Sequence, residues 1–179
     1  ISPSQILAVT FTNKAAQEIR HRLDKLFPVQ SLWIGTFHSL FARLLRFDIN
    51  KYQDEQRRTW KRNFSIFDES DVQSLFKNIV TKELNLDNKK FDPRKIRYTV
   101  SNAKNQGLTP EAYAKQEPGY RGRVISEIYN EYQSRLAANN ALDFDDLILK
   151  TVEVLQRFPE AKARFRSRFR HVLVDEYQD

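Results

Sequence analysis

The sequence contains no cysteine and no methionine, and only four of its 179 residues are glycine. Without cysteine, neither a disulfide framework nor a cysteine-ligated zinc site can form, which favours an intracellular, cytoplasmic location. Because no methionine begins the chain, which opens just ahead of an apolar run, we expect a piece excised from a longer protein. No stretch approaches the roughly 20 apolar residues that span a bilayer, and nothing reads as a signal peptide, so we expect no membrane partner.

Acidic residues are fewer than basic ones. Lys and Arg number 30 against 23 Asp and Glu, a formal net charge of +7. This balance favours an anionic partner such as nucleic acid. Hydrophobic residues make up 40% of the chain and aromatic residues 12%, which is enough to bury a core.

Short apolar runs alternate with amphipathic segments at both ends of the chain. The runs ILAVT (6–10), LWI (32–34) and HVLV (171–174) predict three strands, and the first two precede apolar residues at helical spacing. Gly35 and Thr36 are expected to break the second strand before its helix. Strands that alternate with helices predict an α/β fold with a parallel sheet.

The middle of the chain differs from its ends. Between residues 46 and 141 no convincing strand is found, and segments such as DESDVQSLFKNIVTKEL have the pattern of capped amphipathic helices. We therefore expect residues 1–45 and 142–179 to form the α/β domain. Residues 46–141 would be an all-helical insertion.

Polar clusters follow each predicted strand, at the edge where parallel sheets bind ligands. After the first strand, Phe11 lies where a base could stack, close to the amide groups that begin the next helix. After the second, Thr36 and His38 offer donors to a phosphate backbone. The alternatives are ordinary: Thr12 or Asn13 as a helix cap, Lys14 as a surface lysine and Phe37 as core.

Acidic residues gather in two places. In VDEYQD, Asp175 could hold Mg²⁺ through water and Glu176 could orient or deprotonate an attacking water, although a solvated strand end is the simpler alternative. In LDFDDL, the favoured interpretation is local. Asp143 would cap a helix, and the acids at 145 and 146 would lie in its first turn, with metal binding as the lesser alternative.

Basic residues also cluster twice. The first cluster lies in and after the second predicted helix, interleaved with aromatic residues, as in proteins that hold single strands; it comprises Arg43, Arg46, Lys51, Arg57, Arg58, Lys61 and Arg62, with Phe41, Phe47, Tyr52 and Trp60. The second has Lys162, Arg166 and Arg170 at i, i+4 spacing. We expect the first cluster to be the better candidate for nucleic acid.

Four segments in this order, AVTFTNKAAQEIRHRL, GTFHSLFARLLR, ALDFDDLIL and HVLVDEYQD, resemble the UvrD/Rep/PcrA family of superfamily 1 DNA helicases. The resemblance spans nearly the whole chain. It implies a partial RecA-like (P-loop NTPase) parallel sheet, subdomain 1A, formed by residues 1–45 and 142–179. The helical residues 46–141 would then be the inserted subdomain 1B.

The resemblance also implies roles for individual residues. TFTNKAA is similar to motif Ia and GTFHS to motif Ib, which would give contacts to single-stranded DNA from Thr10, Phe11, Thr12, Asn13, Lys14, Thr36, Phe37 and His38, extended by Arg43 and Arg46. VDEYQD is similar to motif II. Asp175 with Glu176 would hold Mg²⁺ through water, and Glu176 would be the general base; the roles of Gln178 and Asp179 are left open.

By resemblance, the parent protein would be an ATP-dependent DNA helicase in repair or replication, moving 3′ to 5′ with its helical subdomain near the junction of single- and double-stranded DNA. The 179 residues contain no GxxxxGK[ST] phosphate loop. We therefore expect the chain alone to be inactive and not to bind ATP and Mg²⁺ tightly. Three alternatives remain: a RecB/AddA-like helicase-nuclease subunit, a non-catalytic nucleic-acid-binding module, and a basic α/β scaffold.

Overall fold

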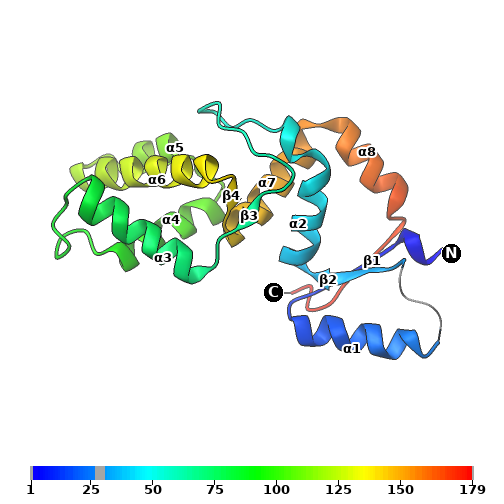
Figure 1. The fold of residues 1–179 in the computed structure, drawn as a ribbon. Coiled ribbons are helices and arrows are strands. Elements are labelled where there is room, and N and C mark those ends of the chain that lie inside the picture. The colour runs from blue at the N-terminus through cyan, green and yellow to red at the C-terminus, as the bar shows by residue number, and fades with distance from the viewer. Residues whose placement is uncertain (1, 27–30, 179) are drawn as a thin grey trace. The chain divides into compact units, whose positions relative to one another are not determined.

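The computed structural model describes residues 2–26 and 31–178. The chain divides into two compact units, which we call the sheet unit (Ile1–Asp48 and Lys150–Asp179) and the helical unit (Ile49–Leu149). Both are shown in Figure 1. The predicted fold class, α/β with a partial RecA-like parallel sheet and a helical insertion, is confirmed. The domain boundaries at 45/46 and 141/142, and the assignment of the two parts to subdomains 1A and 1B, stay predictions.

The sheet unit is built from strand–helix alternation. Its elements are a 3-10 helix at Pro3–Gln5, β1 (Ile6–Thr10), α1 (Asn13–Asp24), β2 (Trp33–Thr36), α2 (Phe37–Asp48), the second part of α7 (Phe144–Arg157), α8 (Pro159–Arg168) and β5 (His171–Val174). The three described strands are parallel in the order β2-β1-β5. All three predicted strands are therefore confirmed.

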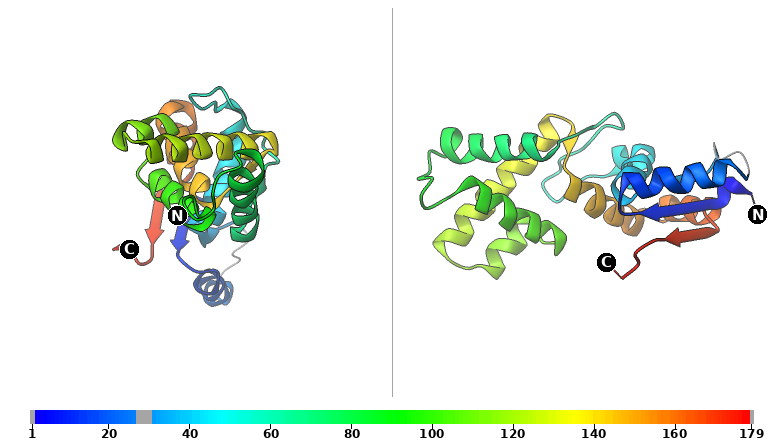
Figure 2. Two further views of the ribbon diagram at one scale, coloured as in Figure 1. Left: turned by 90° about the vertical axis from the view of Figure 1, so that its left-hand side faces the viewer. Right: turned by 90° about the horizontal axis from the view of Figure 1, so that it is seen from below.

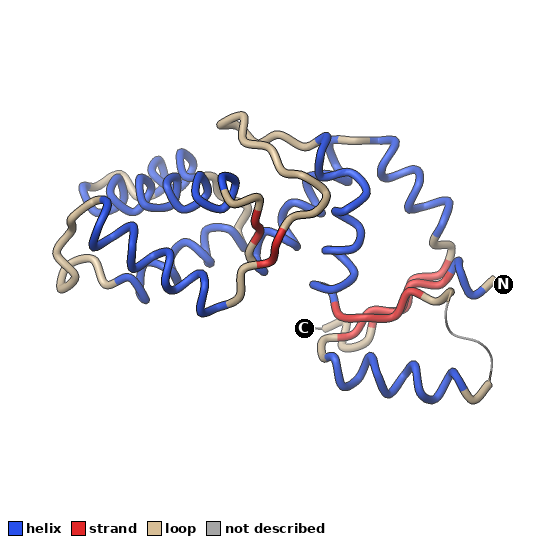
Figure 3. Tube along the Cα trace, viewed as in Figure 1, coloured by secondary structure: helices blue, strands red, loops and turns tan. Residues whose placement is uncertain are grey.

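Both faces of this sheet are covered. Figure 3 shows α1 on one face and α2 and α8 on the other. On the first face, Ala8 and Ile34 pack with Ala16 of α1; on the second, Leu7 and Trp33 pack with residues of α2 such as Leu40 and Leu44. Two covered faces explain why β1 is apolar almost throughout and does not alternate with polar residues.

The expected break at Gly35 and Thr36 is wrong, because both residues belong to β2. The glycine is needed for a close approach and not for a turn. A Cβ atom on Gly35 would lie 2.5 Å from Ser39 Oγ and 3.3 Å from Leu40 Cγ, in the first turn of α2. The strand can run directly into the helix because Gly35 leaves this space.

The helical unit contains the short 3-10 helix Ile49–Lys51, β3 (Ser65–Ile66), α3 (Glu69–Asn78), a π-helical turn (Ile79–Glu83), α4 (Pro93–Asn105), α5 (Pro110–Gln116), α6 (Tyr120–Ala138), β4 (Ala141–Leu142) and the first part of α7. Helix α6 packs against α3, α4 and α5 (Figure 2). Its core includes Phe76 and Tyr132, whose rings stack with centroids 4.3 Å apart.

The expectation that residues 46–141 hold no strand is wrong. β3 and β4 pair in parallel, with Ser65 opposite Ala141 and Ile66 opposite Leu142. Each strand has two residues, too few to show an alternating pattern.

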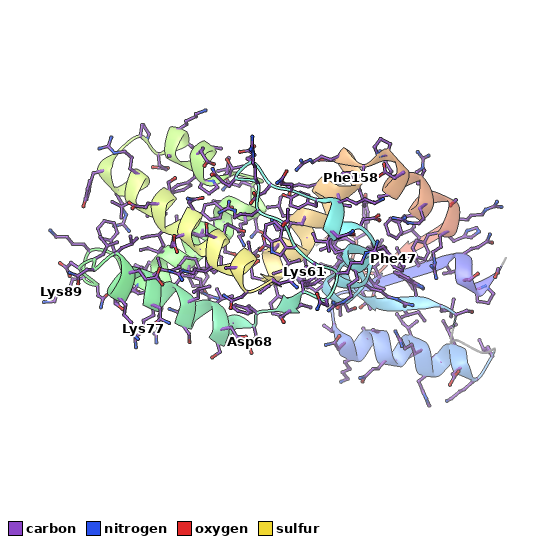
Figure 4. The ribbon with its side chains drawn as sticks, turned by 45° about the horizontal axis from the view of Figure 1, so that its top comes forward. Phe47, Lys61, Asp68, Lys77, Lys89 and Phe158 are labelled. Atoms are coloured by element: carbon purple, nitrogen blue, oxygen red, sulfur yellow. The ribbon has the colours of Figure 1, made fainter. Side chains whose placement is uncertain are left out.

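Helix caps follow the sequence closely. Asp68 and Asp71 form a capping box at the start of α3, where Figure 4 labels Asp68. α4 and α5 each begin with a proline preceded by a capping side chain, Asp92 and Thr109 respectively. Across the described residues, none of the helices has both the length and the apolar character needed to cross a membrane.

Candidate functional site

The carboxyl ends of the three parallel strands meet at one edge of the sheet unit. Thr10, the last residue of β1, lies opposite Thr36 of β2, and Val9 lies opposite Val174 of β5. The segments that leave these ends are the predicted ones, FTNK, FHS and DEYQ. We call this edge, with residues 10–14, 36–38 and 175–178, the carboxyl edge.

Phe11 is an exposed aromatic residue with a fixed neighbour. Half of its surface (50%) is open to solvent. Its ring meets Phe37 edge to face, with centroids 5.6 Å apart, and Phe37 meets Phe41 in the same way at 5.8 Å. Phe37 and Phe41 are partly buried against the core of the sheet unit. The core therefore holds Phe11 in place while leaving its ring available for stacking.

The residues after Phe11 begin helix α1. Thr12 is the cap, because its side-chain oxygen accepts a hydrogen bond of 3.1 Å from the Ala15 amide. Asn13 and Lys14 are exposed in the first turn. Their side chains, together with the amides of that turn, face solvent beside the strand end, where an anion is favoured.

Thr10 and Thr36 are placed differently from the other predicted contacts. Their side chains are buried, with only 1% and 8% of the residue surface exposed. The Thr36 hydroxyl accepts from the Ser39 amide at 3.3 Å, while Ser39 Oγ donates to the Thr36 carbonyl at 2.9 Å. Thr36 thus holds the first turn of α2, which positions the half-buried His38. A contact of either threonine with DNA stays a prediction.

The acidic pair lies directly beyond β5. The Asp175 amide donates to the Val9 carbonyl at 2.9 Å, which extends the pairing with β1 by one residue. Glu176 has a left-handed backbone (φ 54°), so the chain turns there and leaves both carboxylates exposed. The Glu176 amide donates to Asp175 Oδ1 at 3.1 Å, and Gln178 Nε2 donates to Glu176 Oε2. Asp179 lies outside the described residues.

Two exposed carboxylates at a strand end fit Mg²⁺ in a nucleotide site. This ion keeps several waters and takes one or two carboxylates along with substrate phosphates, so it needs no dedicated protein cage. Among the described residues, no group of three or more His, Cys, Asp or Glu side chains is placed to hold a metal ion. The phosphates would need a cradle that no GxxxxGK[ST] sequence in these 179 residues supplies.

Comparison with known proteins identifies the family of the chain. The family model "UvrD/REP helicase N-terminal domain" matches residues 1–179. The chain belongs to the UvrD/Rep helicase family. It is 45% identical over 181 aligned residues to the ATP-dependent DNA helicase PcrA of Bacillus subtilis (strain 168), and 41% identical to PcrA of Staphylococcus aureus (strain NCTC 8325). Each alignment covers all of this chain and 24% of the relative, so the chain spans about a quarter of the length of these relatives.

Not every candidate in this UvrD/Rep family chain lies at the carboxyl edge. The Arg43 guanidinium carbon lies 3.8 Å from the centroid of the Trp33 ring. Trp33 is the first residue of β2 and pairs with Leu7 of β1. It therefore lies at the amino end of β2. Arg46 follows in the last turn of α2, farther from the start of that helix. The structure therefore groups Arg43 with a different part of the sheet unit from Phe11.

Two aromatic rings of the first basic cluster are not available for stacking. Tyr52 and Trp60 are buried, each with 2% of its surface exposed, and the Trp60 indole donates to the Ala141 carbonyl at 2.9 Å. Arg58 pairs with Asp54 at 2.6 Å and donates to Asn130. The expectation that this cluster interleaves charges with stacking aromatics is wrong at these two rings, because both are buried.

The LDFDDL segment holds a buried ion-pair network that the sequence does not reveal. Asp143 caps α7, as predicted, by accepting from the Asp146 amide at 2.7 Å. Its other oxygen accepts from Lys104 Nζ and from the Tyr132 hydroxyl, both at 2.6 Å, and Lys104 Nζ lies 3.1 Å from Asp146. Lys104 is 39 residues away in the chain, so only the fold brings the charges together.

Burial and charge shift the pKa values in this network. Burial raises the pKa of Asp143, and the Asp146 charge raises it further. Burial alone would lower the pKa of Lys104, but the two carboxylates outweigh it and hold that pKa above its usual range. Burial also raises the pKa of the Tyr132 hydroxyl, with Asp143 adding to the effect. The network is therefore a charged lysine inside the helical unit, held by two acids that the sequence alone presents as a helix cap and a residue of the first helical turn.

Proposed function

We propose that the protein containing these residues is an ATP-dependent DNA helicase that moves 3′ to 5′ along single-stranded DNA in repair or replication in the cytoplasm. The observation that supports this most is the carboxyl edge itself. One edge of one sheet carries the exposed ring of Phe11, packed on the partly buried Phe37, together with the exposed start of α1 and the exposed carboxylates of Asp175 and Glu176. A structural sheet needs only caps and turns there.

In this proposal the DNA strand lies over Phe11, whose ring stacks on a base. Stacking on an aromatic side chain is sequence-tolerant, because every base has a π face, and it suits a motor that moves along any sequence. Asn13, Lys14 and His38 would contact the backbone, with Phe37 holding the Phe11 ring from below. The helical unit would lie near the junction with duplex DNA.

The nucleotide half of the site would use Asp175 and Glu176. Asp175 would hold Mg²⁺ through water, and Glu176 would orient the hydrolytic water and take its proton. When bound, Mg²⁺ supplies charge neutralisation at the phosphates. The acidic pair follows β5, which pairs with β1 from Ile6 to Val9, and the Asp175 amide extends this pairing up to the end that precedes Phe11. A nucleotide-driven shift of β5 would thus reach the DNA residues directly.

These 179 residues alone are not expected to hydrolyse ATP or unwind DNA, because they supply Mg²⁺ ligands without a phosphate loop. They should still bind single-stranded DNA weakly, with affinity that falls as salt rises.

Phe11→Ala tests the DNA half of the proposal. Removing one stacking ring should weaken binding of a single-stranded oligonucleotide by about 1–3 kcal/mol, roughly 5- to 150-fold. The matched control is Tyr120→Ala, which removes a ring that is 67% exposed on the helical unit and should leave affinity unchanged. Fluorescence anisotropy gives the affinities, and circular dichroism checks the fold. Wild-type affinity in a folded Phe11→Ala protein, or collapse of the fold, would remove the stacking role.

A further inference from the structure

A second charged surface lies at the amino end of β2, on the sheet unit. The guanidinium carbons of Arg43 (α2) and Arg168 (α8) lie 3.8 Å and 4.7 Å from the centroid of the Trp33 ring. That ring is itself fixed: it is 1% exposed, Phe47 stacks on it, and Phe169 meets it edge to face at 5.0 Å. Two exposed arginines are thus held over one rigid aromatic ring.

A third arginine reaches the same strand from the opposite face of the sheet. Arg20 of α1 donates to the carbonyl oxygen of Ile34, the residue after Trp33. Burial lowers the pKa of Arg43, and the charges of Arg168 and Arg20 lower it further. The three helices that cover the sheet therefore bring their positive charges within electrostatic reach of one another at one place.

Carboxylates do not neutralise this group. In the described ranges, 2–26 and 31–178, neither Arg43 nor Arg168 has an acidic side chain within 4.0 Å. The acid of α2, Asp48, is taken by Arg164 of α8. Like charges gathered without a counter-ion cost stability, so their arrangement favours an anionic ligand.

The positive charge continues along and just beyond α8. Residues 162–170 include five basic side chains and no acid. The expected i, i+4 grouping of Lys162, Arg166 and Arg170 is wrong at Arg170, because α8 ends at Arg168 and Phe169 is already extended. The sheet unit as a whole has 13 Lys and Arg against 8 Asp and Glu, whereas the helical unit has 17 against 15. Most of the net charge of the chain therefore belongs to the smaller, sheet-forming part.

We infer that Arg20, Arg43 and Arg168 form a second binding site for the phosphodiester backbone of nucleic acid, separate from the carboxyl edge. A guanidinium presents a planar fork that binds phosphate oxygens in pairs, and stacking on a fixed ring leaves little freedom to lose on binding.

The position of this surface separates it from the proposed motor site. Trp33 begins β2, whereas Phe11 and Glu176 lie beyond the carboxyl ends of their strands. A short oligonucleotide that fills the carboxyl edge would not need the arginine surface, and a longer strand would use both. The inference rests on the DNA binding proposed above, and strand length is the variable that distinguishes the two sites.

The test is binding of fluorescent single strands of about 8 and about 40 nucleotides to the whole protein, by anisotropy over a range of salt. The variant is Arg43→Gln with Arg168→Gln. Losing two phosphate contacts should lower the salt slope for the long strand by about 1.4 and its affinity by about 20-fold near 0.1 M salt. The short strand should bind as to wild type.

Two further double variants serve as controls. Arg22→Gln with Lys25→Gln removes the same charge from exposed positions in the last turn of α1 and at its C-cap, and it should behave as wild type. Arg43→Lys with Arg168→Lys keeps the charge without the fork, and it should recover the salt slope even if the glutamine variant melts early.

Three results would overturn the inference. The first is long-strand binding that the glutamine variant leaves unchanged. The second is equal weakening for both lengths, which would place the arginines in the same track as Phe11. The third is unchanged DNA binding with loss of binding to poly-glutamate, which would indicate an acidic protein partner. Failure of the short strand to bind wild type would instead count against the proposed motor site.

Discussion

Lys104 has an unusual position for a lysine, because its side chain is fully buried and its charge is matched only by neighbours inside the helical unit. Removing a lysine charge from water costs several kcal/mol, which two carboxylates and good geometry offset. The network ties α4 to the start of α7 and, through Tyr132, to α6. Its contribution is to fix these helices in one arrangement.

Lys104→Met should destabilise the helical unit by about 3–5 kcal/mol, because it leaves two buried carboxylates without a cation. Adding Asp143→Asn and Asp146→Asn should recover most of this loss, since asparagine is also a good cap for α7. Lys77→Met on the exposed side of α3, labelled in Figure 4, is the control and should change stability by less than about 0.5 kcal/mol. Urea unfolding measures all three. A Lys104→Met protein as stable as the Lys77→Met protein would contradict the stabilising role of the network.

The same network predicts sensitivity to alkaline pH. The pKa of Lys104 is raised in the folded state, so its stabilisation is complete below the unfolded pKa of about 10.4 and is lost as pH rises through the folded value. The raised pKa of Tyr132 acts in the same direction, because the unfolded chain ionises first. Stability between about pH 9 and 11 should therefore fall less steeply in the triple variant than in wild type. Parallel curves would contradict this account.

Prediction from sequence succeeded for residues whose role is local. Thr12 and Asp143 are caps, as their positions before helical patterns indicate, and Asp175 and Glu176 follow a strand as the apolar run indicates. It failed where burial decides. The buried state of Thr36, Tyr52 and Trp60, and the pairing of Lys104, depend on which distant residues cover them.

At the scale of elements, a glycine without a Cβ atom lets the start of a helix pack closely against neighbouring backbone. Gly122, near the start of α6, lies against the turn that follows α5. A Cβ atom there would be 1.9 Å from the Glu117 carbonyl oxygen and 2.9 Å from its carbonyl carbon. Because these are backbone atoms, no side-chain rotation can relieve the clash.

Gly122→Ala should therefore destabilise the helical unit by about 3 kcal/mol, at the upper end of ordinary overpacking. Gly119→Ala is the matched control, because its Cβ would have no neighbour within 4 Å. As Gly119 is the helix cap, a few tenths of a kcal/mol are expected there. Thermal unfolding compares the two. Equal effects would show that the turn moves aside.

The type of an element was predictable where several residues carry its pattern, and where both faces of the sheet are covered so that a strand is apolar throughout. The three strands of the sheet follow from their apolar runs, and the capped helices α3 and α4 follow from their first residues. β3 and β4 were not predictable, because two residues carry no periodicity and their pairing joins positions 65 and 141. The prediction of a strand break at Gly35 was wrong because glycine occurs both where a strand ends and where two elements pack closely.

At the scale of the whole molecule, the two units divide the candidate roles. The sheet unit carries the carboxyl edge, the arginine surface and most of the net charge, while the helical unit has its own core and its own buried network. β5 pairs only with β1 among the described strands, and Val172 and Leu173 are 56% and 60% exposed. This leaves apolar surface beside the acidic pair, where further sheet could pack.

Membership of the UvrD/Rep family was predictable at this scale because four motifs occur in one order, which no single motif would establish. The positions of Arg43 and Arg46 were not predictable. They share α2 with Phe37 and His38, yet a helix of twelve residues is about 18 Å long, so one sequence segment contributes to two separate surfaces.

The most direct test of the central claim is ATP hydrolysis by the whole protein, with and without single-stranded DNA, comparing wild type with Glu176→Gln. The substitution keeps the size of the side chain and removes the proton acceptor. We expect turnover that DNA stimulates in wild type and a loss of at least about 100-fold in the variant, the lower range for a general base. DNA binding in the absence of nucleotide should be retained. Wild-type turnover in Glu176→Gln, or no DNA-stimulated turnover in wild type, would contradict the account.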